Sequence, residues 1–203
     1  HDVSPEFSRI VTESCGVIAR EVESVRKLVN EFAQFARFPA VSLEPANLNS
    51  VIREAMHVFE ARLTGIDIQM DLAPTLPQLR IDREQIKRVI VNLVDNAAEA
   101  MLGSPWKRLT ISTDVTADCV EMVVADTGCG ISMEDKERLF MPYFSTKNRG
   151  TGLGLAIVNN ILAEHHARIR AEDNEPCGAR FVVELPLPGG ASVEPAPLVE
   201  QPS

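Results

Sequence analysis

The sequence reads N-L-V-D-N-A-A-E-A-M at residues 92–101, D-T-G-C-G-I at 126–131, L-F-M-P-Y-F-S-T-K at 139–147 and G-T-G-L-G-L at 150–155. Any one of these motifs alone is weak, because glycine-rich triplets and asparagine pairs arise by chance. Together they concentrate amide, carboxylate and glycine residues in the second half of the chain. Both the fold and the function are therefore expected to centre on residues 92–155.

The residues around the motifs predict helices and strands that mix without a regular βαβ alternation. Helices are indicated by apolar residues in steps of three and four at 48–63, 83–101 and 151–165. Strands are indicated by alternating or continuous apolar residues at 66–72, 109–115, 120–126, 169–172 and 181–185. This pattern predicts an α+β fold, a two-layer α/β sandwich in which helices cover one face of a mixed sheet.

Local signals refine this expectation at three places. Asn47 or Asn49 is expected to cap the helix that follows. Asp82, with Gln85 three residues later, forms a capping-box pattern for the next helix. Between these helices, residues 66–72 alternate apolar and polar side chains, so this strand is expected to be half-buried.

Residues 7–38 predict a long amphipathic helix. Its apolar or small residues recur at Phe7, Val11, Ser14, Ile18, Val22, Val25, Val29, Phe32 and Ala36. A helix of this length cannot bury such a stripe alone, so it needs a partner helix or a surface of its own domain. The expected organisation is this helix at 1–38, a linker at 39–47, a folded domain at 48–187 and a Pro-rich, disordered tail at 188–203.

The composition excludes some classes of protein. The chain has 203 residues with 20 Lys and Arg against 29 Asp and Glu, a net charge of −9, which argues against nucleic-acid binding. Cys15, Cys119, Cys129 and Cys177 lack the spacing of a zinc or redox site, so reduced thiols in a cytoplasmic protein are expected. No apolar run approaches the roughly 20 residues that cross a bilayer, so no direct membrane contact by this fragment is expected. The start at His1 resembles the edge of a longer protein, which could carry membrane segments upstream.

The first two motifs contain groups suited to a metal–nucleotide complex. Asn92 and Asn96 are four residues apart, so they project from the same face of the predicted helix. A carboxamide oxygen is a suitable neutral ligand for Mg²⁺, which usually keeps several waters and spans substrate phosphates. Asp126 ends an apolar strand, and its carboxylate can accept the exocyclic N6–H of adenine, which guanine cannot offer. Gly128 and Gly130 allow the backbone to turn close to a base, and Cys129 between them is interpreted as a small filler.

The last two motifs supply cations and a helix start. Lys147 and Arg149 are the cations next to the glycines and are therefore candidates for phosphate contacts. The glycines of residues 150–155 open a helix whose free N–H groups and dipole suit anionic phosphates. A Rossmann dinucleotide site is the competing interpretation, but its G-x-G-x-x-G spacing and a preceding Val/Ile-rich strand are missing. Phe140 and Phe144 are expected to pack rather than to bind a base.

In this order, the four motifs closely resemble the N, G1, F and G2 boxes of sensor histidine kinases, which belong with gyrase, Hsp90 and the MutL proteins. The segment E-F-A-Q-F-A-R before Pro39 resembles the second hairpin helix of the dimerisation bundle in nitrogen-regulation-type kinases. The resemblance implies ATP and Mg²⁺ as cofactors, Asn96 as the metal ligand, and Asn92, Asn96 and Lys147 as catalytic residues. It also implies a lid at residues 132–150. The nucleotide-binding residues that it implies are Asn92, Asn96, Asp126, Gly128, Gly130, Ile131, Lys147, Arg149, Gly150, Thr151, Gly152, Leu153, Gly154 and Leu155.

The residue at position 92 distinguishes the kinases of this group from the ATPases that hydrolyse ATP. Gyrase, Hsp90 and MutL have at this position a Glu that acts as the general base for hydrolytic water, and Asn cannot take a proton. The chain is therefore expected to keep the γ-phosphoryl for transfer. The alternatives are a conformational-switch ATPase and a degenerate kinase that acts as a binding module. Two positions depart from the family pattern, because Glu99 replaces a Lys, Arg or Gln, and Gly178-Ala179 replaces Gly-Thr.

The resemblance also implies a phospho-accepting histidine on a first hairpin helix, followed by an acidic residue and soon by Pro. His1 imitates this pattern, but Pro5 is one residue early. His57, His165 and His166 lack the acidic residue that follows the acceptor, and helix-dipole contacts or solvation account for them. The acceptor is therefore expected to be absent from this chain. The partners implied are a response-regulator receiver domain and a second copy of the chain, paired through the helical hairpin.

Overall fold

One layer of the molecule is a five-stranded sheet. The computed structural model describes residues 40–59, 62–145 and 151–188, with residues 6, 9, 11–19, 21–22 and 25–26 of the N-terminal segment. The strands lie in the order β2-β4-β5-β7-β6. β2 pairs with β4 in parallel, and the other pairs are antiparallel. The bounds are β2 (Asp67–Leu72), β4 (Arg108–Val115), β5 (Cys119–Asp126), β6 (Arg168–Asp173) and β7 (Ala179–Pro186).

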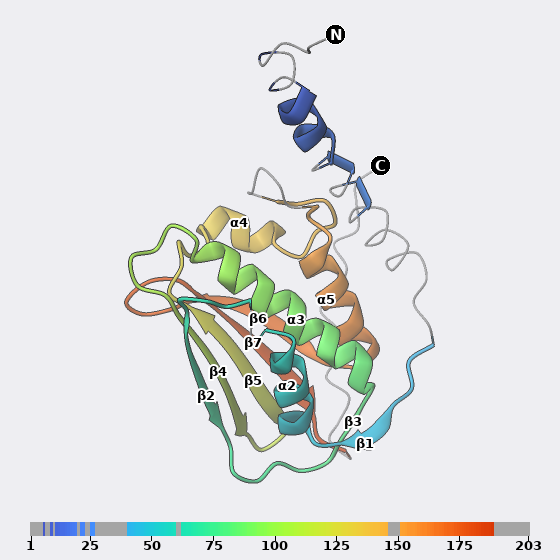
Figure 1. The fold of residues 1–203 in the computed structure, drawn as a ribbon. Coiled ribbons are helices and arrows are strands. Elements are labelled where there is room, and N and C mark those ends of the chain that lie inside the picture. The colour runs from blue at the N-terminus through green and yellow to red at the C-terminus, as the bar shows by residue number, and fades with distance from the viewer. Residues whose placement is uncertain are drawn as a thin grey trace, which may run out of the picture.

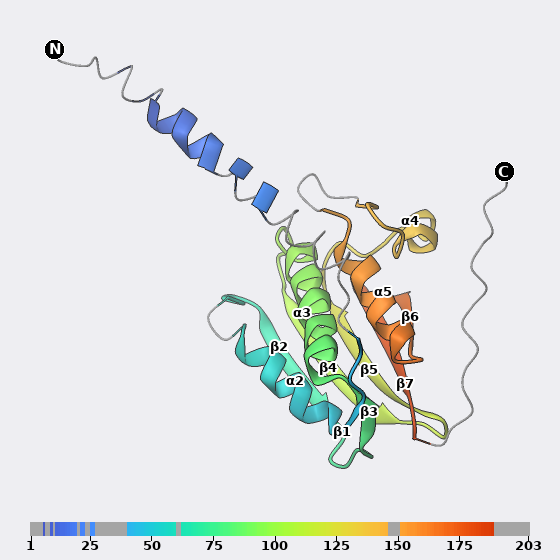
Figure 2. The same cartoon turned by 90° about the vertical axis from the view of Figure 1, so that its right-hand side faces the viewer.

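Three helices form the second layer on one face of the sheet, as Figures 1 and 2 show. They are α2 (Leu48–His57), α3 (Arg83–Ala100) and α5 (Gly154–Glu164). The short α4 (Met133–Arg138) lies beyond them, and a small separate sheet pairs β1 (Glu44–Ala46) with β3 (Leu79–Ile81). The predicted two-layer sandwich with a mixed sheet is confirmed.

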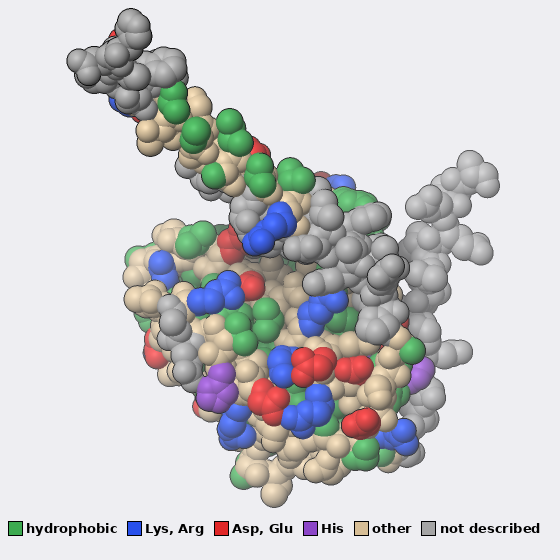
Figure 3. Space-filling view, turned by 45° about the vertical axis from the view of Figure 1, so that its right-hand side comes forward, with side chains coloured by type: hydrophobic (Ala, Val, Ile, Leu, Met, Phe, Trp, Pro, Cys, Tyr) green, Lys and Arg blue, Asp and Glu red, His purple; other side chains and the backbone are tan. Residues whose placement is uncertain are grey.

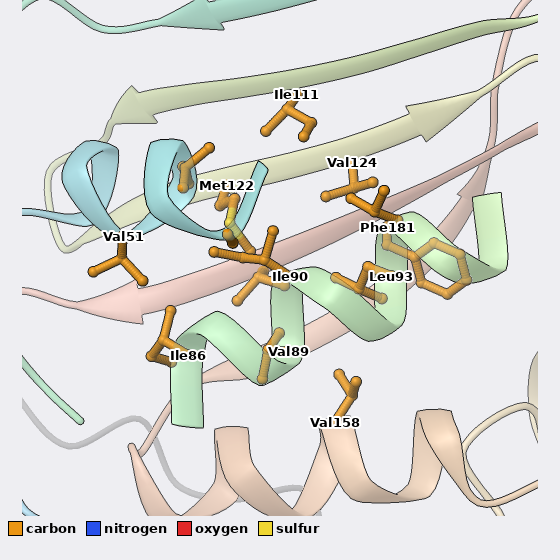
Figure 4. Close-up of a cluster of buried hydrophobic side chains, with 14 of the residues drawn as sticks. Val51, Ile86, Val89, Ile90, Leu93, Ile111, Met122, Val124, Val158 and Phe181 are labelled. Atoms are coloured by element: carbon orange, nitrogen blue, oxygen red, sulfur yellow. The ribbon is translucent and has the colours of Figure 1, made fainter. Parts of the chain in front are cut away.

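The core lies between the two layers, as the close-up in Figure 4 shows. Alternate residues of β4 and β5 face the helices, so Ile111 and Met122 are completely buried. Ile90 and Leu93 of α3 meet them from the helix layer and are also fully buried. At about 25 cal/mol for each Å² of apolar surface removed from water, this shared face holds α3 firmly on the sheet. The residues of the central helix are thereby fixed in position.

Two caps begin the helices as predicted, with one difference. Asn47 caps α2 by accepting a hydrogen bond from the Ser50 N–H at 3.3 Å, so Asn47 is the cap and Asn49 is not. Asp82 caps α3 by accepting from the N–H groups of Glu84 and Gln85, each at 3.1 Å. The Gln85 side chain is buried without returning a hydrogen bond, so only half of the capping box forms.

Several expected boundaries are corrected. The expected linker at 39–47 contains β1, because its residues pair with β3, itself not predicted. The helix expected from residue 151 begins at Gly154, and the helix expected to reach residue 63 ends at His57. The prediction that β2 is half-buried is wrong, because Ile68 and Met70 remain 38% and 47% exposed on this edge strand.

The long N-terminal helix is described only in part. Residues 11–19 are helical, and Val17, Ile18 and Val22 are about half exposed or more, at 49%, 62% and 61%. Figure 3 shows hydrophobic side chains along this helix, which projects from the domain. Residues 27–39 and the Pro-rich tail from 189 lie outside the described residues, so the expectations for them stay predictions. Within the described residues, no helix is both long enough and apolar enough to cross a bilayer.

Candidate functional site

A cavity of about 260 Å³ opens where α3, the end of β5 and the start of α5 meet. The segment after α4 forms another wall. Nine of the predicted nucleotide-binding residues line this cavity, and they come from the motifs at residues 92–101, 126–131 and 150–155. These are Asn92, Asn96, Asp126, Gly130, Ile131, Thr151, Gly152, Gly154 and Leu155.

Asn92 and Asn96 lie on the cavity side of α3, as their four-residue spacing predicts. The Asn92 Nδ2 donates to the Arg88 carbonyl at 2.9 Å, one turn earlier on the same helix. This bond turns the Asn92 Oδ1 toward α5, where it would lie 3.0 Å from a Cβ atom added at Gly154. The Asn96 amide has no hydrogen bond with any residue that the structure describes. Its oxygen is therefore available to a ligand without breaking a contact.

Asp126 is held rigidly at the cavity wall by backbone donors. Its side chain is 2% exposed, and Oδ1 accepts from the N–H of Gly128 at 2.8 Å and from that of Ala179 at 3.4 Å. Its carbonyl accepts from the Asn174 side chain at 2.8 Å. These bonds join the end of β5 to the turn between β6 and β7, so the carboxylate is oriented before any ligand arrives.

Two glycines allow the backbone to pack around Asp126. Gly178 has φ +104°, and a Cβ atom there would lie 1.9 Å from the Asp126 carbonyl oxygen. A Cβ atom at Gly128 would lie 2.7 Å from the backbone carbonyl of Ala100 at the end of α3. No side chain fits at either position, because the neighbouring backbone already occupies the space. Gly128 therefore supports the site without lining the cavity.

The start of α5 closes the opposite wall. Gly152 has φ +69°, and its carbonyl accepts from the Tyr143 N–H at 3.0 Å. A Cβ atom at Gly152 would lie 2.5 Å from the Tyr143 carbonyl carbon, so the glycine brings the two segments into contact. The N-cap of α5 is Leu153, whose side chain makes no capping bond. The first N–H groups of α5 are thus without a side-chain cap, which suits an anionic ligand.

The charged groups that line the cavity are acidic among the residues that the structure describes. Asp95, Glu99 and Asp135 line it, and Asp95 also pairs with Arg62 at 3.0 Å. The predicted phosphate-binding cations Lys147 and Arg149, with Gly150, lie outside the described residues, as does part of the predicted lid. A ligand with several negative charges would be repelled by these carboxylates, so it would require a bound cation beside them.

Sequence reasoning missed part of the cavity wall. Phe181 lines it from β7, but only the strand order places β7 beside β5. Ala179, where the family pattern has Thr, lines it from the same strand, as the resemblance implied. Phe144, expected only to pack, lines the cavity. The Arg138 guanidinium carbon lies over its ring, 4.8 Å from the ring centroid. Cys129, interpreted as a filler, also lines it, whereas Leu153 is fully buried in the core instead. The remaining lining residues that were not predicted are Ala100, Leu139 and Ser145.

Comparison with known proteins agrees with this geometry. The model of the family described as histidine kinase-, DNA gyrase B-, and HSP90-like ATPase matches residues 81–189. The sensor histidine kinase ZraS of Escherichia coli O157:H7 is 31% identical over 173 residues, covering 84% of this chain and 37% of that protein. The nitrogen regulation protein NtrY of Azorhizobium caulinodans is 30% identical over 203 residues, covering 94% and 26%. The chain thus spans well under half the length of these relatives.

Solved structures show the same fold. The catalytic domain of the histidine kinase ThkA superposes with a TM-score of 0.65 at 35% identity, covering 71% of this chain and 95% of that one. A second structure contains ThkA in complex with the response regulator protein TrrA. It superposes with a TM-score of 0.74 at 28% identity, covering 92% of this chain and 53% of that one.

Proposed function

Since the chain belongs to the histidine kinase-, DNA gyrase B- and HSP90-like ATPase family, we propose that it is the ATP-binding catalytic domain of a sensor histidine kinase. Its cavity binds Mg²⁺-ATP and presents the γ-phosphoryl to a histidine of another helical segment, from which it passes to a response-regulator aspartate. The observation that carries this proposal is the meeting of Asn92, Asn96, Asp126 and the start of α5 around one cavity.

The two ends of the cavity suit the two ends of the nucleotide. Asp126 is buried and oriented, so it can accept the N6–H of adenine at a fixed position. The apolar side chains of Phe181 and Ile131 line the same cavity and suit the flat face of a base. The uncapped N–H groups of α5 lie toward the other end, where they suit phosphate.

The donor set near Asn96 fits Mg²⁺. Its carboxamide oxygen makes no hydrogen bond with a described residue, and the carboxylates of Asp95 and Glu99 line the same wall. Mg²⁺ prefers oxygen ligands and keeps several waters, so one amide ligand with phosphate oxygens and waters is sufficient. Bound there, the ion would neutralise phosphate charge that the acidic wall otherwise repels. We assign Asn96 as the protein ligand and Asn92 to the phosphates.

Asn92 favours phosphoryl transfer over hydrolysis. Its Nδ2 already donates to Arg88, and its amide cannot accept a proton from water. The chain's own residues therefore bind and orient ATP, and the remaining work is positioning and charge neutralisation. A conformational-switch ATPase would need a base at this position, and a binding module would not need the oriented carboxylate of Asp126. Lys147 and Arg149 remain proposed phosphate contacts.

The proposed partners follow from relatives and from the exposed helix. ThkA binds the response regulator TrrA in its solved complex, and we propose that a receiver domain binds the whole kinase here in the same way. The exposed apolar side chains of Val17, Ile18 and Val22 need a cover, for which we propose the helical hairpin of a second copy. Transfer from ATP to these partners would take place in the cytoplasm, where ATP is available.

Calorimetric titration of the chain with ATP tests this function. Asn96→Ala should weaken binding in Mg²⁺ and change it little in EDTA, because its proposed contact runs through the ion. Asp126→Asn should weaken binding by about tenfold or more in both buffers, because it loses the charged acceptor for the adenine amine. Matched controls are Asn159→Ala on the exposed face of α5 and Asp71→Asn on β2. Unchanged affinity in both site variants would reject the assignment of the cavity.

The kinase assignment has a separate test. The chain alone should show very slow ATP hydrolysis and no acid-labile phosphorylation. Addition of a purified helical hairpin that carries an acceptor histidine should restore transfer. Rapid hydrolysis by the unaltered chain would favour the switch ATPase, and tight ATP binding without transfer to any hairpin would favour the binding module.

A further inference from the structure

His165 is a buried histidine at the end of α5 opposite to the cavity. Its side chain is 3% exposed, and its two ring nitrogens both make hydrogen bonds. Nδ1 lies 2.7 Å from the Ile161 carbonyl oxygen, and Nε2 accepts from the Asp82 N–H at 2.9 Å. Because a carbonyl only accepts and an N–H only donates, Nδ1 carries the proton and the imidazole is neutral. The ring therefore joins the last turn of α5 to the residue that caps α3.

Asp82 extends this connection to the segment that enters the domain. Its Oδ1 caps α3, and its Oδ2 accepts from the Ser42 N–H at 3.1 Å. The next residue, Leu43, is held in turn, because its carbonyl accepts from the Arg80 guanidinium at 3.1 Å. The incoming segment, α3 and α5 therefore meet at one junction made of Ser42, Asp82 and His165.

The junction lies where α3 begins and α5 ends, and the cavity lies along the second half of α3 and at the start of α5. Asp82 meets His165 at one end of α5, and Asn92, near the middle of α3, approaches Gly154 at the other end of α5, so α3 and α5 run antiparallel. The two helices pack against each other through completely buried residues such as Val89 and Val158, which Figure 4 shows between them. Packed interiors have low compressibility and transmit strain. A change in their spacing at the junction is therefore transmitted to the cavity.

We propose that His165 is a positioning residue that sets the spacing of α3 and α5 for nucleotide binding and couples that spacing to the incoming segment at Ser42. This inference rests on the nucleotide binding proposed above. Protonation provides a way to break the junction. A second proton on Nε2 would face the Asp82 N–H, so the hydrogen bond between the two helices would be lost.

The groups around His165 set its pKa, and therefore the pH at which the ring takes up the second proton. Burial lowers the pKa of His165, and the neighbouring His166 lowers it further, whereas the Ile161 carbonyl and the carboxylates of Asp82 and Glu164 raise it. One carboxylate oxygen of Glu164 is buried without a hydrogen-bond partner. Since burial is the largest cause, the neutral imidazole persists below the usual histidine pKa of about 6.5. The junction is thus intact at neutral pH and opens in acid.

Two substitutions of His165 test separately its hydrogen bond to the Ile161 carbonyl and its hydrogen bond from the Asp82 N–H. His165→Gln keeps an acceptor near the position of Nε2, so it should bind Mg²⁺-ADP within about twofold of the unaltered chain at pH 7.5. His165→Asn keeps only a donor near the position of Nδ1 and should weaken binding about threefold to tenfold, the effect of one lost hydrogen bond. As the pH is lowered stepwise from 7.5, binding by the unaltered chain should weaken relative to His165→Gln, which does not titrate. His166→Asn, at an exposed position with φ +53°, is the control: it should keep a pH dependence, moved toward higher pH because His166 no longer lowers the pKa of His165.

Ser42→Pro tests the coupling without altering the buried ring. It removes the N–H that donates to Asp82 at an exposed position, so the protein should fold even if His165→Asn does not. Weaker Mg²⁺-ADP binding by Ser42→Pro supports coupling to the incoming segment. Unchanged affinity in Ser42→Pro rejects that coupling, and equal affinities of His165→Asn and His165→Gln at every pH reject the positioning role. Failure of the unaltered chain to bind the nucleotide would instead reject the proposed function.

Discussion

A position can require glycine because its φ is positive or because a Cβ atom would collide with neighbouring backbone. Four glycine-to-alanine substitutions measure these two effects separately. Gly103 has an ordinary φ and open space around it, so alanine should be neutral or slightly stabilising there. Gly65 has φ +81° and open space, so its variant reports backbone strain alone. Gly128 has an ordinary φ, but a Cβ atom would lie 2.7 Å from the Ala100 backbone, so its variant reports contact alone. Gly178 combines φ +104° with a distance of 1.9 Å to the Asp126 carbonyl.

The free energies of unfolding should follow this design. The left-handed conformation costs an alanine about 1–2 kcal/mol, which is the loss expected for Gly65→Ala. Forcing a methyl group into packed backbone costs about 1–3 kcal/mol, which is the loss expected for Gly128→Ala. Gly178→Ala should lose about the sum, roughly 2–5 kcal/mol. For a domain of this size that corresponds to a lower Tm by roughly 4–20 °C.

Urea and thermal unfolding followed by circular dichroism provide the measurement. Nucleotide binding adds an independent readout, because Gly178→Ala and Gly128→Ala should displace Asp126, whereas Gly65→Ala and Gly103→Ala should leave the cavity unchanged. If Gly178→Ala unfolds within about 0.5 kcal/mol of Gly103→Ala, the close packing around Asp126 is wrong. If it matches Gly65→Ala, strain alone accounts for the glycine and the contact argument fails.

Three further outcomes are expected. Thr113→Val should lower the free energy of unfolding, measured in urea, by about 1–3 kcal/mol, because the Thr113 hydroxyl donates to the buried Asn49 Oδ1 at 2.9 Å. The control Thr110→Val, on the open face of the sheet, should change it little. The free energy of unfolding should fall as pH decreases below about 6.5, because burial lowers the folded-state pKa of His165 and the unfolded state then binds more protons. The same dependence of the unfolding free energy on pH in His165→Gln would contradict this. Ile18→Glu, at a side chain that is 62% exposed, should reduce the dimer fraction in sedimentation, and a strictly monomeric unaltered chain would reject the proposed pairing.

The sequence was most informative where local patterns and long elements coincide. The three large helices and the five strands of the main sheet were predicted, because each combines a clear apolar period with a turn or cap signal. Asn92 and Asn96 were predicted to share a face, because helix geometry alone decides it. β1 and β3 were not predicted, because three-residue strands carry no measurable period, and their pairing joins residues far apart in the chain.

The features that were missed depend on tertiary neighbours. The alternation in β2 predicts a buried side, but Ile68 and Met70 lie at a sheet edge that the helices leave open. Phe181 reaches the cavity only because β7 pairs with β5. His165 at a helix end was attributed to dipole contacts or solvation, and it does bond the Ile161 carbonyl in the last turn of α5. Its second bond, to Asp82, joins residues 83 positions apart and leaves no local signal.

The strand order also determines when the sheet can be completed. β7, the last strand in the part of the chain that the structure describes, lies between β5 and β6 and pairs with both. While the chain emerges from the ribosome, β6 therefore has no neighbour, and β5 presents an open edge until residues 179–186 have been made. Such unpaired edges recruit other strands, so the nascent domain is open to aggregation until β7 is released. A chain that stops before residue 179 would lose the strand that joins two parts of the sheet, and not merely a terminal strand.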